Sequence, residues 1–154
     1  MKLRVGGPLT GQSRVCEPIL RALPDWFGHE AFTQAYMTQT DLLPTFVAVT
    51  EEATVGFLTL KQHSGAAVEI LVMGVLPQYH HRGIGRALIE AAENYLRRTG
   101  ISFLQVKTLS ARHPDPCYAR TRAFYKAMGF SALEEFAEIW DADSPCLQMI
   151  KYLL

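Results

Sequence analysis

The segment that most constrains this chain is residues 68–88, which read VEILVMGVLPQYHHRGIGRAL. An apolar strand runs into a short turn of histidine, arginine and glycine, and a helix begins directly after Gly83-Ile84-Gly85. The unpaired amide N–H groups of a helix start converge on one point, where the helix dipole also favours negative charge. Glycines let a bulky ligand such as a pyrophosphate approach the backbone. The segment therefore predicts an anion site; the alternative is a turn that only joins a strand to a helix.

The composition fits one domain that spans residues 1–154. Hydrophobic residues make up 49% of the chain, which is enough to build a substantial core at this length. The 15 Lys and Arg residues balance 15 Asp and Glu residues, so the formal net charge is zero. No global electrostatic field then recruits nucleic acid or an anionic membrane, and we expect neither as a partner. The predicted anion site must be a local feature.

The cysteines and the apolar segments indicate a cytoplasmic protein. Cys16, Cys117 and Cys146 are an odd number, widely spaced and without a CxxC motif, which favours reduced thiols over a disulfide framework. The opening residues MKLRVGG lack the apolar region of a signal peptide, and no stretch reaches membrane-spanning length. We therefore expect a cytoplasmic location.

The order of the predicted elements is that of a mixed α+β domain. Helical periodicity with proline and glycine stops predicts helices over residues 14–23, 30–38, 84–98 and 115–128. Runs rich in β-branched and aromatic residues predict strands over residues 3–5, 45–50, 54–61, 67–75, 101–108, 130–140 and 146–153. The second and third strands form a predicted hairpin around Glu51-Glu52-Ala53. Both faces of residues 68–75 are largely apolar, which predicts a central, buried strand.

Two common nucleotide-binding motifs do not fit the glycine turn. A P-loop requires Gly-Lys-Ser/Thr, whereas Gly85 is followed by Arg86 and Ala87. A Rossmann fingerprint requires a third small residue where Leu88 stands, and it opens a βαβ unit rather than following a hairpin.

The turn and a second motif resemble the GNAT superfamily of acetyl-CoA-dependent N-acetyltransferases. The coenzyme motif of that family is Gln/Arg-x-x-Gly-x-Gly/Ala after a strand that ends near Val-x-Pro, and here Val75-Leu76-Pro77 precedes Gly83-Ile84-Gly85. Residues 123–130, AFYKAMGF, are similar to its second signature, a Phe-Tyr pair followed by Gly-Phe. The resemblance implies a single GNAT domain whose central, mixed and mostly antiparallel twisted sheet has about six to seven strands flanked by about four helices.

The sequence departs from the family pattern at several positions. His80 replaces the usual Gln or Arg, and His81 replaces a common glycine, although Arg82 follows at a position where a basic residue is frequent. In the second motif, Tyr118 and Thr121 replace an Asn and a small Ala. A coenzyme contact from that Asn therefore does not transfer to this chain.

The resemblance assigns the coenzyme contacts residue by residue. The amides of the turn would hold the pyrophosphate, with Arg82 or Arg86 adding charge-assisted contacts. The pantetheine arm would pair with the edge of the strand at Met73 to Val75, and the Met73 N–H would polarise the thioester carbonyl. The full set of expected coenzyme residues is Met73, Gly74, Val75, His81, Arg82, Gly83, Ile84, Gly85, Arg86, Ala87, Tyr118 and Phe124.

Two residues are candidates for proton transfer. Tyr125 of the Phe-Tyr pair is the expected general acid for the departing CoA thiolate; the alternative is an aromatic residue packed in the core. Glu69 is the expected general base, because a carboxylate inside an apolar strand is costly to bury unless something uses or pairs it. Its alternatives are an ion pair with a neighbouring Lys or Arg, or a position facing solvent.

The sequence gives weaker indications of where the acceptor binds. Trp26 and Phe27 lie between the first two predicted helices, where family members wall the acceptor pocket, and core packing is the alternative. An acidic group around Glu134 and Glu135 would attract a cationic amine or simply be a solvated surface. Adjacent His80 and His81 lack metal-ligand spacing, so we expect no metal.

The predicted function is transfer of acetyl from acetyl-CoA to a primary amine within a ternary complex. A small metabolite or amino acid is preferred over a protein amine, because the zero net charge gives no attraction to histone tails or RNA. The alternatives are a non-catalytic acyl-CoA sensor and an enzyme for a longer acyl donor. The C-terminal strands offer an edge for a homodimer.

Overall fold

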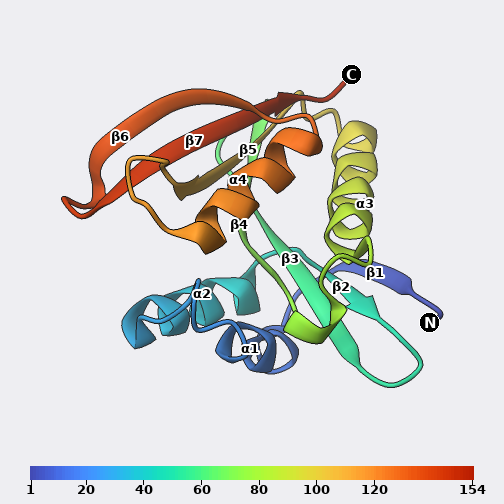
Figure 1. Ribbon diagram of the computed structural model, residues 1–154. Coiled ribbons are helices and arrows are strands. Elements are labelled where there is room, and N and C mark those ends of the chain that lie inside the picture. The colour runs from blue at the N-terminus through green and yellow to red at the C-terminus, as the bar shows by residue number, and fades with distance from the viewer.

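The computed structural model describes residues 1–154 and contains one sheet with helices on both faces (Figure 1). The helices are α1 (Ser13–Arg21), α2 (Glu30–Leu42), α3 (Ile84–Arg98) and α4 (Pro116–Ala127), with a short 3₁₀ helix η1 (Pro77–Tyr79). The strands are β1 (Arg4–Leu9), β2 (Thr45–Val49), β3 (Thr54–Gln62), β4 (Ala67–Val75), β5 (Phe103–Leu109), β6 (Ser131–Asp141) and β7 (Ser144–Tyr152). The predicted α+β class is confirmed.

The seven strands lie in the order β1-β2-β3-β4-β5-β7-β6. Every neighbouring pair is antiparallel except β4 and β5, which run parallel. The predicted hairpin of β2 and β3 is present, and β4 occupies the middle of the sheet as its two apolar faces predicted. The sheet is therefore mixed and mostly antiparallel.

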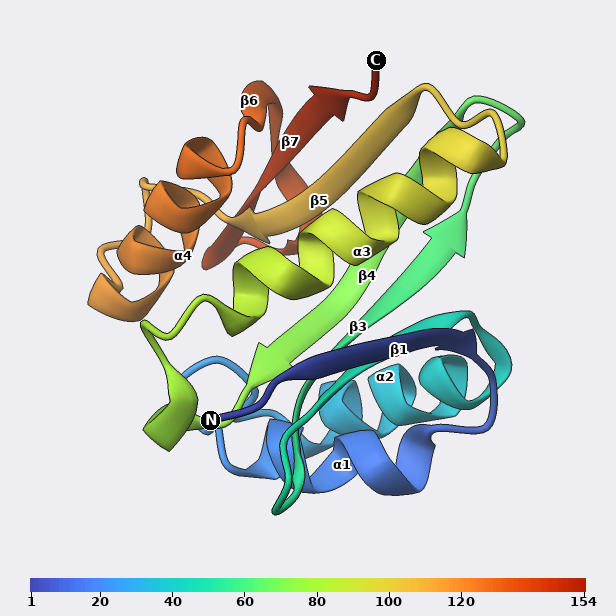
Figure 2. The ribbon, with the colours of Figure 1, turned by 90° about the vertical axis from the view of Figure 1, so that its right-hand side faces the viewer.

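The sheet separates two hydrophobic clusters. The larger cluster joins α3 and α4 to one face, and includes Leu88 and Leu96 of α3 with Leu58 and Leu104 of the strands. The smaller cluster lies under α1 and α2, where Leu20 packs with Phe57 and Val72. Figure 2 shows α3 lying across the face that the larger cluster covers. Successive strand residues alternate between these clusters, because side chains along a strand point to opposite faces.

The two helices on the α3 face begin and end at residues suited to those positions. α3 follows Gly83, whose φ of 81° lies in the left-handed region that glycine adopts readily. α4 begins with Pro116, and the Asp115 carboxylate accepts hydrogen bonds from the Cys117 and Tyr118 amides. Gly129, with a φ of 97°, follows the end of α4.

The sheet opens between its two parallel strands. β4 pairs with β5 only from Ala67 to Ile70, opposite Phe103 to Val106. Beyond that point β4 stays paired with β3 as far as Val75, and β5 stays paired with β7 as far as Leu109. β4 and β5 therefore no longer pair with each other beyond Ile70, and a gap forms between the two halves of the sheet.

The first strand and second helix differ from the prediction. β1 continues through Pro8 to Leu9, whereas the predicted strand ended at residue 5. β1 is an edge strand, and an edge strand tolerates proline because the missing N–H needs no partner. α2 runs to Leu42 rather than residue 38, and ends just before Pro44.

The three cysteines are free, as predicted. None of the helices combines the length and apolar character needed to cross a bilayer.

Candidate active site

A cavity of about 590 Å³ occupies the opening between β4 and β5. On the α3 face its wall includes Gly83, Gly85 and Phe124, and on the α1 and α2 face it includes Phe27 and Tyr36. Because residues from both faces line one cavity, it passes through the plane of the sheet. Two ligands can therefore meet in it from opposite sides.

Most residues predicted for the site lie together in this wall. The predicted residues that line the cavity are Trp26, Phe27, Met73, Gly74, Val75, His81, Gly83, Ile84, Gly85, Arg86, Tyr118, Phe124 and Tyr125. Glu69, Arg82 and Ala87 do not line it. The Arg82 guanidinium instead lies 5.4 Å from the centre of the Tyr79 ring, over its face.

The start of α3 presents backbone amides to the cavity. The amides in the first turn of a helix have no intrahelical acceptor. In α3 no side chain caps them either. The Ala87 amide is different, since it donates to the Gly83 carbonyl at 3.0 Å. The Ala87 N–H is thus already used within the helix, whereas the amides before it have no such partner, and the coenzyme contact of Ala87 stays a prediction.

Gly85 allows α3 and α4 to approach each other. A Cβ atom at Gly85 would lie 3.0 Å from the Phe124 ring and 3.8 Å from the Met73 Cε atom. The absence of a side chain thus lets the Phe124 ring pack directly on the backbone of the glycine turn. This contact places the Phe-Tyr pair beside the glycine turn.

The free edge of β4 lies along the cavity. From Leu71 to Val75 this edge has no β5 partner, so its main-chain groups can pair with an extended ligand. One of the carbonyls on β4, that of Val75, accepts a hydrogen bond from His80 Nε2 at 2.7 Å. His80 thus fixes the end of β4 to the turn that follows it, a role that its sequence position did not reveal.

Tyr125 is buried but borders the cavity. Its side chain is 5% exposed, and its ring packs edge-on against Phe130 with 5.5 Å between centroids. The hydroxyl makes no hydrogen bond to a protein group. Burial raises the pKa of the Tyr125 phenol well above its ordinary value, with smaller contributions from Tyr118 and Tyr36. The phenol is therefore a protonated donor with no protein acceptor.

Glu69 forms a buried polar group with two partners. Its oxygens each lie 3.4 Å from Lys107 Nζ, and Oε1 lies 2.6 Å from His63 Nε2. Glu69 is 5% exposed, and of these three residues only Lys107 lines the cavity. The structure thus shows the ion pair that was the alternative to a base role. Any proton transfer from the cavity to Glu69 must pass through Lys107 or a water.

The loop between α1 and α2 is fastened to α4. The Trp26 indole N–H donates to Thr121 Oγ1 at 3.0 Å, and the Tyr118 hydroxyl donates to the Trp26 carbonyl at 2.9 Å. Burial raises the pKa of Tyr118 to about 12, which keeps this hydroxyl a donor. Both α4 residues are departures from the family pattern. Their positions were noted in the sequence, but their shared partner 92 to 95 residues away was not predicted.

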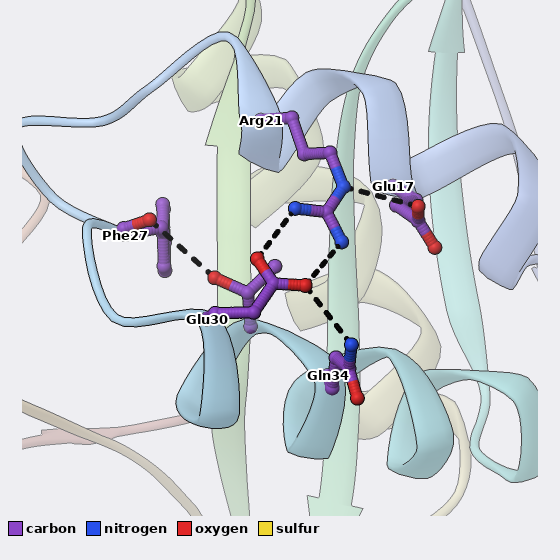
Figure 3. Close-up of polar contacts among 6 residues, drawn as sticks. Glu17, Arg21, Phe27, Glu30 and Gln34 are labelled. Carbon is purple, nitrogen blue, oxygen red and sulfur yellow. Dashed lines mark hydrogen bonds and ion pairs between the residues drawn. The ribbon is translucent and has the colours of Figure 1, made fainter.

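A second set of contacts joins the two ends of the same loop. Arg21 at the end of α1 forms a bidentate pair with Glu30 at the start of α2, with distances of 2.7 and 2.9 Å (Figure 3). Arg21 also contacts Glu17, and Gln34 donates to Glu30. The Arg21 hydrogen bonds hold the pKa of Glu30 at about 2. Trp26 and Phe27 therefore lie on a loop whose two ends are held together.

Other charged residues do not gather at the cavity as an acidic site. Glu135 contacts Ser110 and Arg112, and no aspartate or glutamate lines the cavity. No group of three or more His, Cys, Asp or Glu residues lies close enough to hold a metal ion.

Comparisons with known proteins agree with this architecture. Residues 42–132 match the family model described as Acetyltransferase (GNAT) domain, and this range covers more than half of the chain. An uncharacterised N-acetyltransferase of Chlorobaculum tepidum is 29% identical over 90 residues, which are 58% of this chain and 51% of that protein. The chain thus spans about half the length of this curated relative.

Solved structures share the fold at low sequence identity. A structure from Desulfovibrio desulfuricans assigned to the GNAT family has a TM-score of 0.86 at 17% identity, with 99% of this chain and 100% of that chain covered. The PaiA N-acetyltransferase of Thermoplasma acidophilum, crystallised with coenzyme A, has a TM-score of 0.76 at 16% identity, with 99% of each chain covered. The motifs, the sheet and the family match agree, and the chain belongs to the GNAT acetyltransferase family.

Proposed function

We propose that the protein transfers an acetyl group from acetyl-CoA to a primary amine by direct attack in a ternary complex. The observation that carries this proposal is the cavity through the sheet, with the glycine turn on one face and the aromatic α1–α2 loop on the other. Such a cavity lets a thioester donor and an amine acceptor meet without sharing an entrance. The membership of an acetyltransferase family supports the same reaction.

The donor half fits acetyl-CoA. The pyrophosphate binds the free amides from Gly83 to Arg86, with the Arg86 guanidinium as an added cation. The pantetheine arm takes the place that β5 leaves vacant beside β4. The Met73 N–H then polarises the thioester carbonyl as a fixed dipole.

The reaction needs two proton movements. The uncharged amine attacks the carbonyl carbon, a C–N bond forms, and the C–S bond breaks as the tetrahedral intermediate collapses. Tyr125 gives its proton to the departing CoA thiolate. The proton lost by the amine passes through a water to Glu69, whose charge is balanced by Lys107 and His63.

The acceptor we propose is a small metabolite or a free amino acid. The cavity wall is mainly apolar and aromatic on the acceptor side, and no carboxylate lines it to attract a strongly cationic chain such as a lysine-rich tail.

The reaction is tested by following free thiol release from acetyl-CoA with a panel of amines, together with calorimetric binding of coenzyme A. We expect tight binding and release that depends on one class of amine. Tight binding without release from any amine would instead support an acyl-CoA sensor. Replacing acetyl-CoA by longer acyl-CoA donors in the same assay tests the acyl group.

Replacing Glu69 by Gln tests the base. The variant should turn over more slowly, because the carboxamide cannot accept the proton. Glu52→Gln, at an exposed position between β2 and β3, is the control. An unchanged rate in Glu69→Gln would remove Glu69 from the mechanism.

A further inference from the structure

The charged residues that line the cavity are all cationic. They are Arg86, Lys107 and Arg120. Arg86 belongs to the first turn of α3, in the donor half, and the Arg120 guanidinium on α4 is directed at the Cys117 sulfur at 3.3 Å. Lys107 is then the one charged residue of the cavity wall that has neither a proposed role in coenzyme binding nor a partner on its own helix or strand.

Lys107 projects from the acceptor face of the sheet. Its neighbour Val106 belongs to the cluster under α3, so the next residue along β5 points to the opposite face. Glu69 obeys the same rule, because Val68 and Ile70 on either side of it belong to that cluster. The Lys107–Glu69 pair therefore lies on the face that α1 and α2 cover, where the acceptor enters.

The Lys107 ammonium is held in place without being saturated. Its contacts with Glu69 are 3.4 Å long, beyond the usual range of a charge-assisted hydrogen bond. Glu69 has a much closer contact, 2.6 Å, with His63. An ammonium has three donors, and the Lys107 side chain is still 26% exposed. Lys107 can therefore bind an additional anion at the cavity wall.

On the α1 and α2 face, the cavity wall to which Lys107 belongs is mainly apolar and aromatic. Tyr36 packs edge-on against Phe27 with 6.0 Å between ring centroids, and Trp26 is fixed by its hydrogen bond to Thr121. These rings form the acceptor half of the wall together with Leu23 and Leu71. An acceptor that fills this half needs an apolar body of similar size.

We propose that the acceptor is a free amino acid with an aromatic or bulky apolar side chain, and that Lys107 binds its carboxylate. This inference rests on the proposed acetyl transfer and narrows its substrate class. An ion pair with Lys107 would orient the amine beside it toward the thioester.

Matched pairs of amines test the role of the carboxylate. Phenylalanine, tryptophan and leucine are each compared with their own amide, which keeps the shape but lacks the negative charge. The measurement is kcat/KM for thiol release, expressed per concentration of unprotonated amine. We expect the amino acid to exceed its amide by about 10- to 100-fold in at least one pair, the range for one charge-assisted hydrogen bond.

Two variants assign this preference to Lys107. Lys107→Met should abolish it, and Lys107→Arg should retain most of it because the charge remains. Circular dichroism spectra of both variants that match the wild type show that the fold is intact.

The outcomes separate this inference from the acetyl transfer. Thiol release that is equal for acids and amides, or faster for amides, overturns the role of Lys107 and leaves acetyl transfer standing. Absence of release with every amine overturns acetyl transfer. In that case calorimetry decides on Lys107 alone: phenylalanine must bind the CoA-loaded protein more tightly than its amide, and Lys107→Met must remove the difference.

Discussion

Tyr125 has a buried ring, and its hydroxyl donates no hydrogen bond to a protein group. Its raised pKa keeps the phenol protonated, so the proton is available to a leaving thiolate. We predict that Tyr125→Phe lowers kcat about 100-fold while the affinity for acetyl-CoA stays nearly unchanged. Steady-state kinetics and calorimetry measure the two quantities.

A matched control for this variant is Tyr95→Phe. Tyr95 of α3 packs on Phe46 of β2 and does not line the cavity. Removing the Tyr95 hydroxyl should therefore leave kcat unchanged. In the wild type, burial also predicts that activity persists at pH values above the ordinary pKa of tyrosine. Normal turnover in Tyr125→Phe would assign the ring to packing alone.

At the scale of elements, the contact between α3 and α4 depends on a missing side chain. In Gly85→Ala the added methyl would meet the Phe124 ring at 3.0 Å, which forces the ring or the helix start to move. We predict that coenzyme A affinity, measured by calorimetry, falls about tenfold, equivalent to about 1.4 kcal/mol. Gly65→Ala is the control, because nothing lies within 4 Å of the added methyl. Equal affinities for both variants would place the phosphates elsewhere.

The loop between α1 and α2 is held by a pair that titrates. Arg21 lowers the pKa of Glu30 from 4.5 to about 2, so the pair stabilises the fold fully above pH 4.5. Its contribution is lost as the pH falls toward 2 and the folded carboxylate becomes protonated. We predict that Glu30→Gln unfolds at lower temperature than the wild type at neutral pH, by a small margin because the pair is exposed to solvent.

The pH dependence identifies the cause of that margin. Thermal unfolding followed by circular dichroism should give a difference between variant and wild type that shrinks steadily below pH 4.5. A difference that does not depend on pH would show that the loss comes from packing of the side chain rather than from its charge.

Local signals predicted the elements but not the contacts between them. Hydrophobic periodicity and the Gly and Pro stops gave α3 its bounds and placed β4 at the centre, because these signals lie within each segment. The Lys107 partner of Glu69 depends on the register of β4 against β5, which no local pattern encodes. The Trp26–Thr121 bond likewise depends on how the α1–α2 loop meets α4. The family motifs predicted most of the residues that line the cavity, and the others are brought there by tertiary packing.

Across the whole molecule, Lys151 joins three elements through residues that do not line the cavity. Its ammonium lies 2.6 Å from the buried Glu93 carboxylate of α3, and donates to the Met128 carbonyl after α4 at 2.7 Å. Removing one partner of a buried pair leaves the other charge uncompensated. We predict that Glu93→Gln lowers the free energy of unfolding by about 3 kcal/mol, measured by urea denaturation.

The exposed Glu90 of the same helix provides the comparison for stability. Glu90→Gln should change the free energy of unfolding by less than about 0.5 kcal/mol. Glu93→Gln should leave kcat unchanged, since Glu93 does not line the cavity. A Glu93→Gln protein as stable as Glu90→Gln would show that the pair adds nothing to the junction of α3 with β7.

The opening between β4 and β5 also constrains inhibitors. Under the proposed reaction, a molecule that links an acceptor covalently to the sulfur of coenzyme A would lie with one part on each face of the sheet, so it would have to pass through the gap rather than bind on one surface. Such a compound should associate slowly and dissociate slowly, even where its contacts are no better than those of its two halves. The residence time of this class of inhibitor would report how readily the two halves of the sheet move apart.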